Sequence, residues 1–167
     1  MQKSPEKQKL PLVGTDNYPE LASGQYVCID KTLFIPEFLR GGEVTLLTYP
    51  SCWNKTTNLT MTEAFLSNHP DNKGSAALFL DKKVAQVDKG SFLKTHQGQY
   101  PVIFLTMKDL RVRDELSFIS SLTKKICKIY NKHSYLLDSI KMKEHEQEKI
   151  KEYCSGAIDK EDLATSL

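Results

Sequence analysis

The segment VTLLTYPSCWNKT, residues 44–56, sets the fold class that we predict for this chain. Residues 44–48 are continuous and apolar, which is typical of a strand buried on both faces of a sheet. Pro50 ends that strand, and apolar residues at helical spacing follow it, so we expect a helix over residues 55–68. This order of strand, loop and helix, with Lys-Thr at the start of the helix, is the layout of a phosphate-binding loop.

The candidate site residues are Asn54, Lys55 and Thr56, at the start of the predicted helix. In a phosphate-binding loop the backbone amides surround the phosphate, the lysine reaches the terminal phosphates, and the hydroxyl binds magnesium. The match is poor, because no glycine lies between Gly42 and Gly74 and Asn54 replaces the glycine before the lysine. The motif by itself therefore favours an ordinary helix start, and a vestigial phosphate loop is the alternative.

Other segments of the chain predict further strands and helices. Residues 26–29 and 102–107 are rich in β-branched and aromatic side chains and predict two more strands. Apolar periodicity and end signals predict helices over residues 33–40, 89–96, 113–133, 136–140 and 143–153, with Gly156 ending the last of these. These elements predict an α/β fold with few strands and several helices, in one domain over residues 11–167 that follows a flexible leader at residues 1–10.

Composition and charge exclude several classes of protein. The 167 residues carry 23 Lys and Arg against 21 Asp and Glu, and this net charge of +2 is too small for a protein that binds nucleic acid by bulk electrostatics. The apolar runs are too short for a transmembrane helix and no signal peptide is recognisable, so we expect a cytoplasmic protein without a membrane partner. The 4 cysteines have no metal-ligand spacing and are expected to be reduced thiols, and no metal site is predicted.

Several blocks of the sequence resemble one known family. They are LPLVG at residues 10–14, YVCIDKT at residues 26–32, KTTNLTM at residues 55–61 and HQGQYPVIFL at residues 96–105. In this order and at these distances they resemble the bacterial AAA-ATPase-like family, a P-loop domain usually found ahead of a PD-(D/E)XK nuclease-like domain. The resemblance implies a P-loop NTPase-like fold.

The chain departs from the family's pattern at the loop and in its acidic residues. Where the family has R-P-R-R-F-G before Lys-Thr, this chain has YPSCWN, residues 49–54, so three arginines and a glycine are missing. The resemblance places the acidic Walker B strand after residues 163–167, so we expect a truncated domain that lacks it. Asp81 and Asp109 are the internal acids nearest to that role, but both are better explained as structural residues. Cys52 lies in the loop without the His and Asn partners of a cysteine hydrolase.

These departures favour a non-hydrolysing binding or regulatory protein of the pseudo-ATPase type. No cofactor is expected beyond weak binding of ATP. Whether the protein is an enzyme stays open, and the degenerate loop argues against catalysis. Since the strands at residues 44–48 and 102–107 would not be neighbours in such a domain, we expect a protein partner or a second copy to complete the sheet. Direct pairing of the two strands is the alternative.

Two other functions compete with this hypothesis. One is a divergent nucleotide-binding ATPase fragment whose missing parts come from another chain. The other is a bacterial effector delivered into a host cell by a secretion system, which the Glu-rich residues 144–152 and the small polar tail at residues 165–167 suggest.

Overall fold

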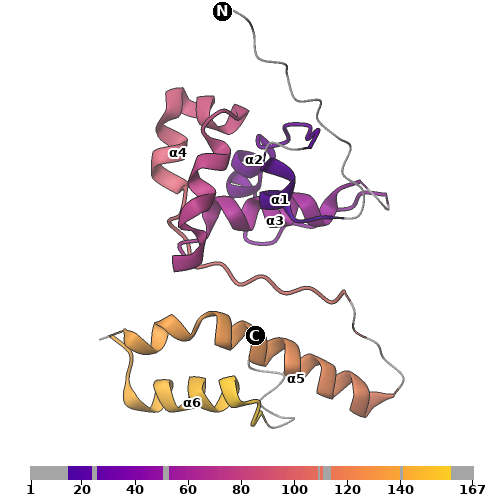
Figure 1. Ribbon diagram of the computed structural model, residues 1–167, viewed down its shortest axis with the longest axis vertical. Coiled ribbons are helices and arrows are strands. Elements are labelled where there is room, and N and C mark those ends of the chain that lie inside the picture. The colour runs from indigo at the N-terminus through magenta and orange to yellow at the C-terminus, as the bar shows by residue number, and fades with distance from the viewer. Residues whose placement is uncertain are drawn as a thin grey trace, which may run out of the picture. The chain divides into compact units, whose positions relative to one another are not determined.

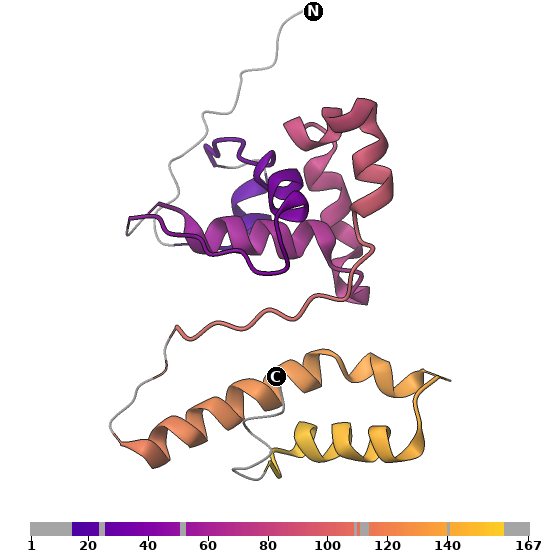
Figure 2. The same ribbon diagram turned by 180° about the vertical axis from the view of Figure 1, so that it is seen from behind.

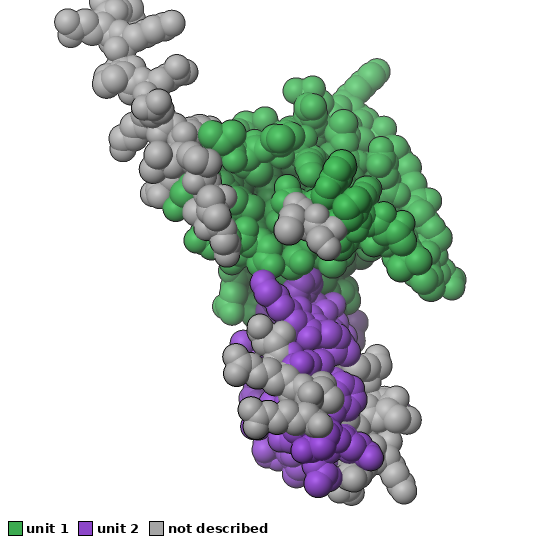
Figure 3. Space-filling model, turned by 90° about the vertical axis from the view of Figure 1, so that its right-hand side faces the viewer, with its two compact units in different colours: residues 1–102 green, residues 103–167 purple. Residues whose placement is uncertain are grey.

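The computed structural model describes residues 15–23, 26–50, 53–108, 110, 114–139 and 141–158. The predicted leader at residues 1–10 lies outside them, as do Cys52 and Asp109. The chain divides into two units, residues 1–102 and residues 103–167 (Figure 3). In the part of the chain that is described, no helix is both long enough and apolar enough to cross a membrane.

Unit 1 is built from short helices around one longer helix, α3 (Lys55–Leu66) (Figure 1). The start of α4 (Ser91–His96) uses Gly90, whose φ of +87° is a left-handed conformation that glycine adopts without the steric cost of a Cβ. The elements are α1 (Tyr18–Ala22), α2 (Phe34–Arg40), α3 (Lys55–Leu66), the 3₁₀ segments η1 (Pro70–Phe79) and η2 (Lys83–Gly90), and α4 (Ser91–His96).

The core of unit 1 is aromatic and centres on α3. Phe65 of α3 is fully buried, and its ring meets Phe79 edge-on at a centroid distance of 5.1 Å and stacks on Phe92 at 6.0 Å. Tyr18 of α1 also stacks on Phe79, at a centroid distance of 5.5 Å. Such pairs add to the free energy that apolar burial alone contributes. The other buried apolar residues of this cluster are Ile35, Met61, Ala64, Leu66 and Val84.

Unit 2 is a pair of helices, α5 (Glu115–Lys132) and α6 (Glu144–Ser155), with the 3₁₀ turn η3 (Ser134–Asp138) between them in sequence. Asp114 starts α5 with a capping box, in which its carboxylate accepts a 2.7 Å hydrogen bond from the Ser117 amide and Ser117 Oγ accepts one from the Asp114 amide. Gly156 ends α6 with a φ of +83°, as the sequence predicted.

The predicted α/β fold class is wrong for the described residues, which are helical and contain no sheet. Figures 1 and 2 show coiled ribbons joined by segments without regular structure, and no arrow. An isolated parallel β-bridge joins Ser67, just after α3, to Tyr100. A truncated P-loop NTPase-like sheet is therefore not the architecture that the described residues adopt.

The physical reason is that, within the part of the chain that the structure describes, no strand lies beside any of the three predicted strands. Residues 26–29, 44–48 and 102–107 have strand-like composition, but strand hydrogen bonds need a second chain segment alongside, and an isolated pair is already marginal in water. Burial was predicted wrongly as well, since Val44 is 91% exposed, Leu46 83% and Ile103 64%.

The predicted helices were mostly right. The helix expected at residues 55–68 is α3. The helices expected at residues 113–133 and 143–153 are α5 and α6. The short helices expected at residues 33–40 and 89–96 are α2 and α4, with slightly different ends. The polar composition of residues 71–75 predicts a loop, but these residues belong to the 3₁₀ segment η1.

Candidate functional site

The side chain of Lys55 is held by the loop in front of its own helix. Lys55 is the first residue of α3, and its Nζ donates hydrogen bonds of 2.7 Å to the Tyr49 carbonyl and 2.9 Å to the Pro50 carbonyl. A phosphate-binding loop presents N–H donors to its ligand and leaves the lysine to meet the phosphate. Here the Lys55 ammonium group is hydrogen-bonded to two carbonyl oxygens instead. The lysine therefore has to break two charge-assisted hydrogen bonds before it can bind an anion.

Asn54 precedes Lys55 in a left-handed conformation, with φ 58° and ψ 32°. Its carbonyl accepts the first hydrogen bond of α3, from the Asn58 amide at 2.9 Å, but its side chain does not cap the helix. A glycine would adopt this backbone conformation freely, and asparagine is among the side chains that tolerate it best. The backbone turn at this position therefore keeps the conformation of a glycine-type turn while carrying a Cβ.

The three predicted site residues lie together because they are consecutive in sequence. Thr56 is partly exposed in the first turn of α3, next to Lys55. Of the two acids considered for metal binding, Asp81 accepts a 2.8 Å hydrogen bond from Lys82 Nζ, and this bond lowers the pKa of its exposed carboxyl. Asp109 and Cys52 lie outside the described residues.

Asp30 fixes the segment that faces the start of α3. Its carboxylate accepts hydrogen bonds from the Thr32 amide at 2.9 Å, the Thr32 hydroxyl at 2.7 Å and the Lys83 amide at 2.8 Å. Desolvation, the largest single effect, raises the Asp30 pKa, but the hydrogen bonds from Thr32 and Lys83 outweigh it and the net pKa is lowered. The ionised carboxylate thus anchors the backbone on either side of Lys31.

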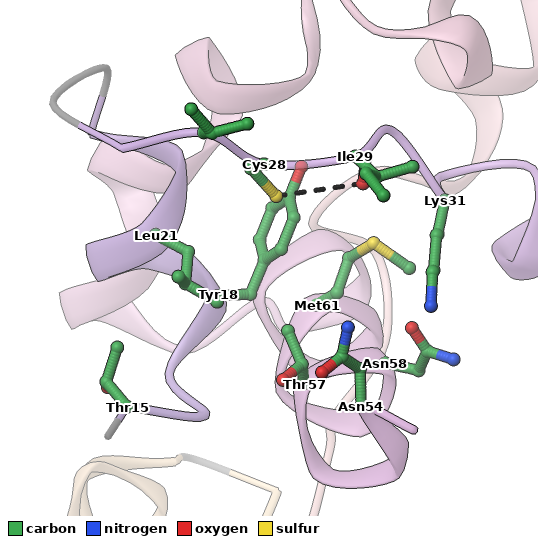
Figure 4. A pocket seen from close by; sticks show the side chains of 11 residues that line it. Thr15, Tyr18, Leu21, Cys28, Ile29, Lys31, Asn54, Thr57, Asn58 and Met61 are labelled. Carbon is green, nitrogen blue, oxygen red and sulfur yellow. Dashed lines mark hydrogen bonds between the residues drawn. The ribbon is translucent and has the colours of Figure 1, made fainter. Parts of the chain in front are cut away.

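A cavity of about 200 Å³ opens between this segment, the region of α1 and the first two turns of α3 (Figure 4). Its walls include Lys31, Asn54 and Asn58, whereas Lys55 and Thr56 do not line it. Sequence reasoning assigned no role to Lys31 or Asn58. Both belong to the blocks at residues 26–32 and 55–61, but only the folded chain brings them to one cavity.

Comparison with known proteins identifies the family. Residues 12–164 match the family described as predicted AAA-ATPase. The chain belongs to this family. No curated protein and no solved structure matches it. The family expected from the sequence blocks is confirmed, while the sheet expected from the same resemblance is absent from the described residues of this family member.

Proposed function

We propose that this member of the predicted AAA-ATPase family binds another protein through residues 44–48 and does not hydrolyse nucleotide. The observation that carries the proposal is the exposure of an apolar, β-branched segment, in which Val44 is 91% and Leu46 83% exposed. No backbone hydrogen bond joins residues 44–48 to another described residue. Apolar side chains and unpaired backbone groups in one segment are what strand addition by a partner chain uses.

The geometry at α3 supports the second half of the proposal. The Lys55 ammonium is engaged by two carbonyls of its own loop, and each hydrogen bond of a charged group contributes about 1.5–3 kcal/mol. The arginines expected in that loop from the family's pattern are absent from residues 49–54. To bind the Lys55 ammonium group, the phosphates of a nucleotide would have to replace the two loop carbonyls as its hydrogen-bond acceptors. No arginine of residues 49–54 would add a second positive charge to offset that cost.

Partner binding is tested at Leu46. Leu46→Lys places a charge on an exposed position, so the chain should fold normally, but a strand-adding partner loses its apolar contact and faces a buried ammonium. Leu80→Lys is the matched control, because Leu80 is 66% exposed in the same unit and lies outside the segment. Proteins crosslinked to the wild-type chain in its native cell are identified, purified and titrated against all three chains. We expect a purified partner to bind wild type and Leu80→Lys alike and Leu46→Lys at least about tenfold more weakly.

Two results would contradict partner binding through this segment: equal affinity of the purified partner for wild type and Leu46→Lys, or loss of binding in both variants. Light scattering on the isolated chain decides whether the partner is a second copy, in which case Leu46→Lys shifts a dimer to a monomer.

Hydrolysis is tested separately with purified chain, ATP and magnesium. We expect phosphate release at the background rate for wild type and for Lys55→Ala alike. Turnover in the range of about 1–100 per second that phosphoryl-transfer enzymes show, lost in Lys55→Ala, would establish the competing hypothesis of a divergent ATPase.

A further inference from the structure

Two cysteines meet where α5 and α6 pack against each other in unit 2. The two helices lie side by side (Figures 1 and 2), and Tyr130 of α5 meets Tyr153 of α6 edge-on at a centroid distance of 4.8 Å. Cys127 follows the fully buried Ile126 in α5, and Cys154 follows the buried Tyr153 in α6. The packing of the helices therefore brings together two thiols that are 27 positions apart in the sequence.

The sulfur of Cys127 touches the backbone of Cys154. Its S–H donates a hydrogen bond to the Cys154 carbonyl oxygen, at an Sγ–O distance of 2.9 Å. Asn131 Nδ2, one turn further along α5, donates to the same carbonyl at 2.9 Å and to the Cys127 sulfur at 3.3 Å. Because the last four carbonyls of a helix have no partner within it, these two side chains of α5 satisfy a carbonyl in the last turn of α6. The end of α6 is thereby held against Cys127.

This contact leaves the two sulfurs within reach of each other. A disulfide needs Cα atoms about 4.4–6.8 Å apart, and one torsion angle moves each cysteine sulfur about its own Cα. A sulfur that already touches the backbone of residue 154 can therefore reach the Cys154 sulfur through side-chain rotation and a shift of the last helical turn. That turn ends at Gly156, and the ends of helices fray more readily than their centres.

The surroundings of the two thiols give them different roles. Both are free and partly exposed, so a small oxidant can reach them. Burial, and then the nearby Cys127, raise the pKa of the Cys154 thiol, which therefore keeps its proton at neutral pH. The Cys127 sulfur accepts a hydrogen bond from Asn131, and a donor at this place stabilises the negative charge of a sulfur that attacks an oxidant. Cys127 is therefore the sulfur expected to react first.

We propose that hydrogen peroxide converts Cys127 and Cys154 into a reversible disulfide that joins α5 to α6. The Cys127 sulfur attacks one peroxide oxygen, the O–O bond breaks, and the released hydroxide takes the thiol proton as water, which leaves a sulfenic acid on Cys127. The Cys154 sulfur then attacks the Cys127 sulfur, the S–O bond breaks, and a second water leaves with the Cys154 proton. The two sulfurs together lose two electrons and the peroxide gains them. This site lies in unit 2 and is independent of the partner surface at residues 44–48.

Mass spectrometry of the full chain tests whether this bond forms. The folded chain is treated with a small molar excess of hydrogen peroxide, alkylated with N-ethylmaleimide and digested with trypsin without reduction. Trypsin cleaves after Lys128 and Lys151, so the two cysteines fall on separate peptides. We expect these peptides to be linked, at least about tenfold more often than any other cysteine pair of the chain, because the fold holds the two thiols together. Dithiothreitol should separate them again.

Serine variants test the role of each sulfur, and circular dichroism shows whether each variant is folded. Cys127→Ser and Cys154→Ser should both abolish the link. Cys28→Ser is the matched control, because it removes an exposed thiol of unit 1 and should leave the link unchanged. In Cys154→Ser the sulfenic acid on Cys127 has no second thiol to attack it, so dimedone should label Cys127 there and should label Cys154 at least about tenfold less in Cys127→Ser.

Hydrogen exchange measures what the bond does to unit 2. A disulfide restricts the unfolded states of the segment that it closes, so the amides of α6 should exchange at least about tenfold more slowly in the oxidised chain, with α3 unchanged. The proposal is overturned if the folded chain links these cysteines no more selectively than the chain in urea. It is also overturned if peroxide carries Cys127 to sulfinic acid without a link, if the link joins two copies of the chain, or if oxidation leaves the exchange of α6 unchanged.

Discussion

At Asp30 a single carboxylate joins two separate stretches of unit 1. It accepts hydrogen bonds from Thr32, just before α2, and from the Lys83 amide at the start of η2. Thr32 is fully buried, and its hydroxyl in turn accepts a hydrogen bond from the Val84 amide at 3.1 Å. These hydrogen bonds link the residues before α2 to the start of η2, and such a network fixes the position of the groups that it joins. Lys31 lies between Asp30 and Thr32 in sequence, so the network also fixes the backbone at this lysine.

The lowered pKa of Asp30 predicts how stability depends on pH. A carboxyl whose pKa is lower in the folded chain stabilises it above the unfolded pKa of about 3.9, and this contribution is lost as pH falls through the folded pKa. We expect Asp30→Asn to lower the melting temperature by about 3 °C or more at pH 7 and to make the decline below pH of about 4 shallower. Asp138→Asn, an exposed carboxylate in unit 2, should keep the wild-type profile. Parallel acid profiles for wild type and Asp30→Asn would contradict this assignment.

The left-handed backbone at Asn54 predicts an order of stabilities. Asn54→Ala should lower the free energy of unfolding by about 1 kcal/mol, because alanine pays the full steric cost of φ 58°. Asn54→Gly should be as stable as wild type within about 0.5 kcal/mol, since glycine adopts this φ freely. Urea titration of the three chains by circular dichroism measures the order. An alanine variant as stable as the glycine variant would show that the turn does not hold this conformation in solution.

At the scale of the element, helices were predictable and strands were not. A helix satisfies its backbone hydrogen bonds within one segment, so the periodicity of residues 113–133 and the Gly156 end signal were sufficient. A strand depends on a second segment, and nothing local in residues 44–48 or 102–107 shows whether one is present. The same difference applies to the site. Asn54 and Lys55 were found as neighbours in sequence, whereas Lys31 and Asn58 meet only through folding.

One face of helix α3 packs in the core of unit 1 and another is exposed. We therefore expect substitutions on the two faces to lower the free energy of unfolding by different amounts. Phe65→Ala removes a ring that is fully buried between Phe79 and Phe92, so we expect a loss of about 3–5 kcal/mol in the free energy of unfolding. Leu59→Ala removes an apolar side chain of the same helix that is 40% exposed, and should cost about 1 kcal/mol or less. Urea denaturation measures both. Similar losses for the two would mean that the aromatic cluster is not the core of this unit.

On the scale of the whole molecule, the two units bury very different apolar cores. Unit 1 has the aromatic cluster around α3, whereas the buried apolar residues described in unit 2 are Ile126 of α5 and Tyr153 of α6, which meets Tyr130 at a centroid distance of 4.8 Å. Asn131 adds hydrogen bonds from its side chain to the carbonyls of Cys127 and Cys154, each 2.9 Å long. A small apolar core gives a low free energy of opening.

This difference predicts separate opening of the two units, which hydrogen exchange of the full chain measures by mass spectrometry. We expect the amides of α5 and α6 to exchange through openings of lower free energy than those of α3, because fewer apolar contacts oppose them. Ile126→Ala should speed exchange in α5 and α6 and leave α3 unchanged, and Phe65→Ala should do the reverse, since each side chain is buried in one unit. Equal protection of α3, α5 and α6, falling together in either variant, would show that the chain unfolds as one cooperative body and that the division after residue 102 has no energetic meaning.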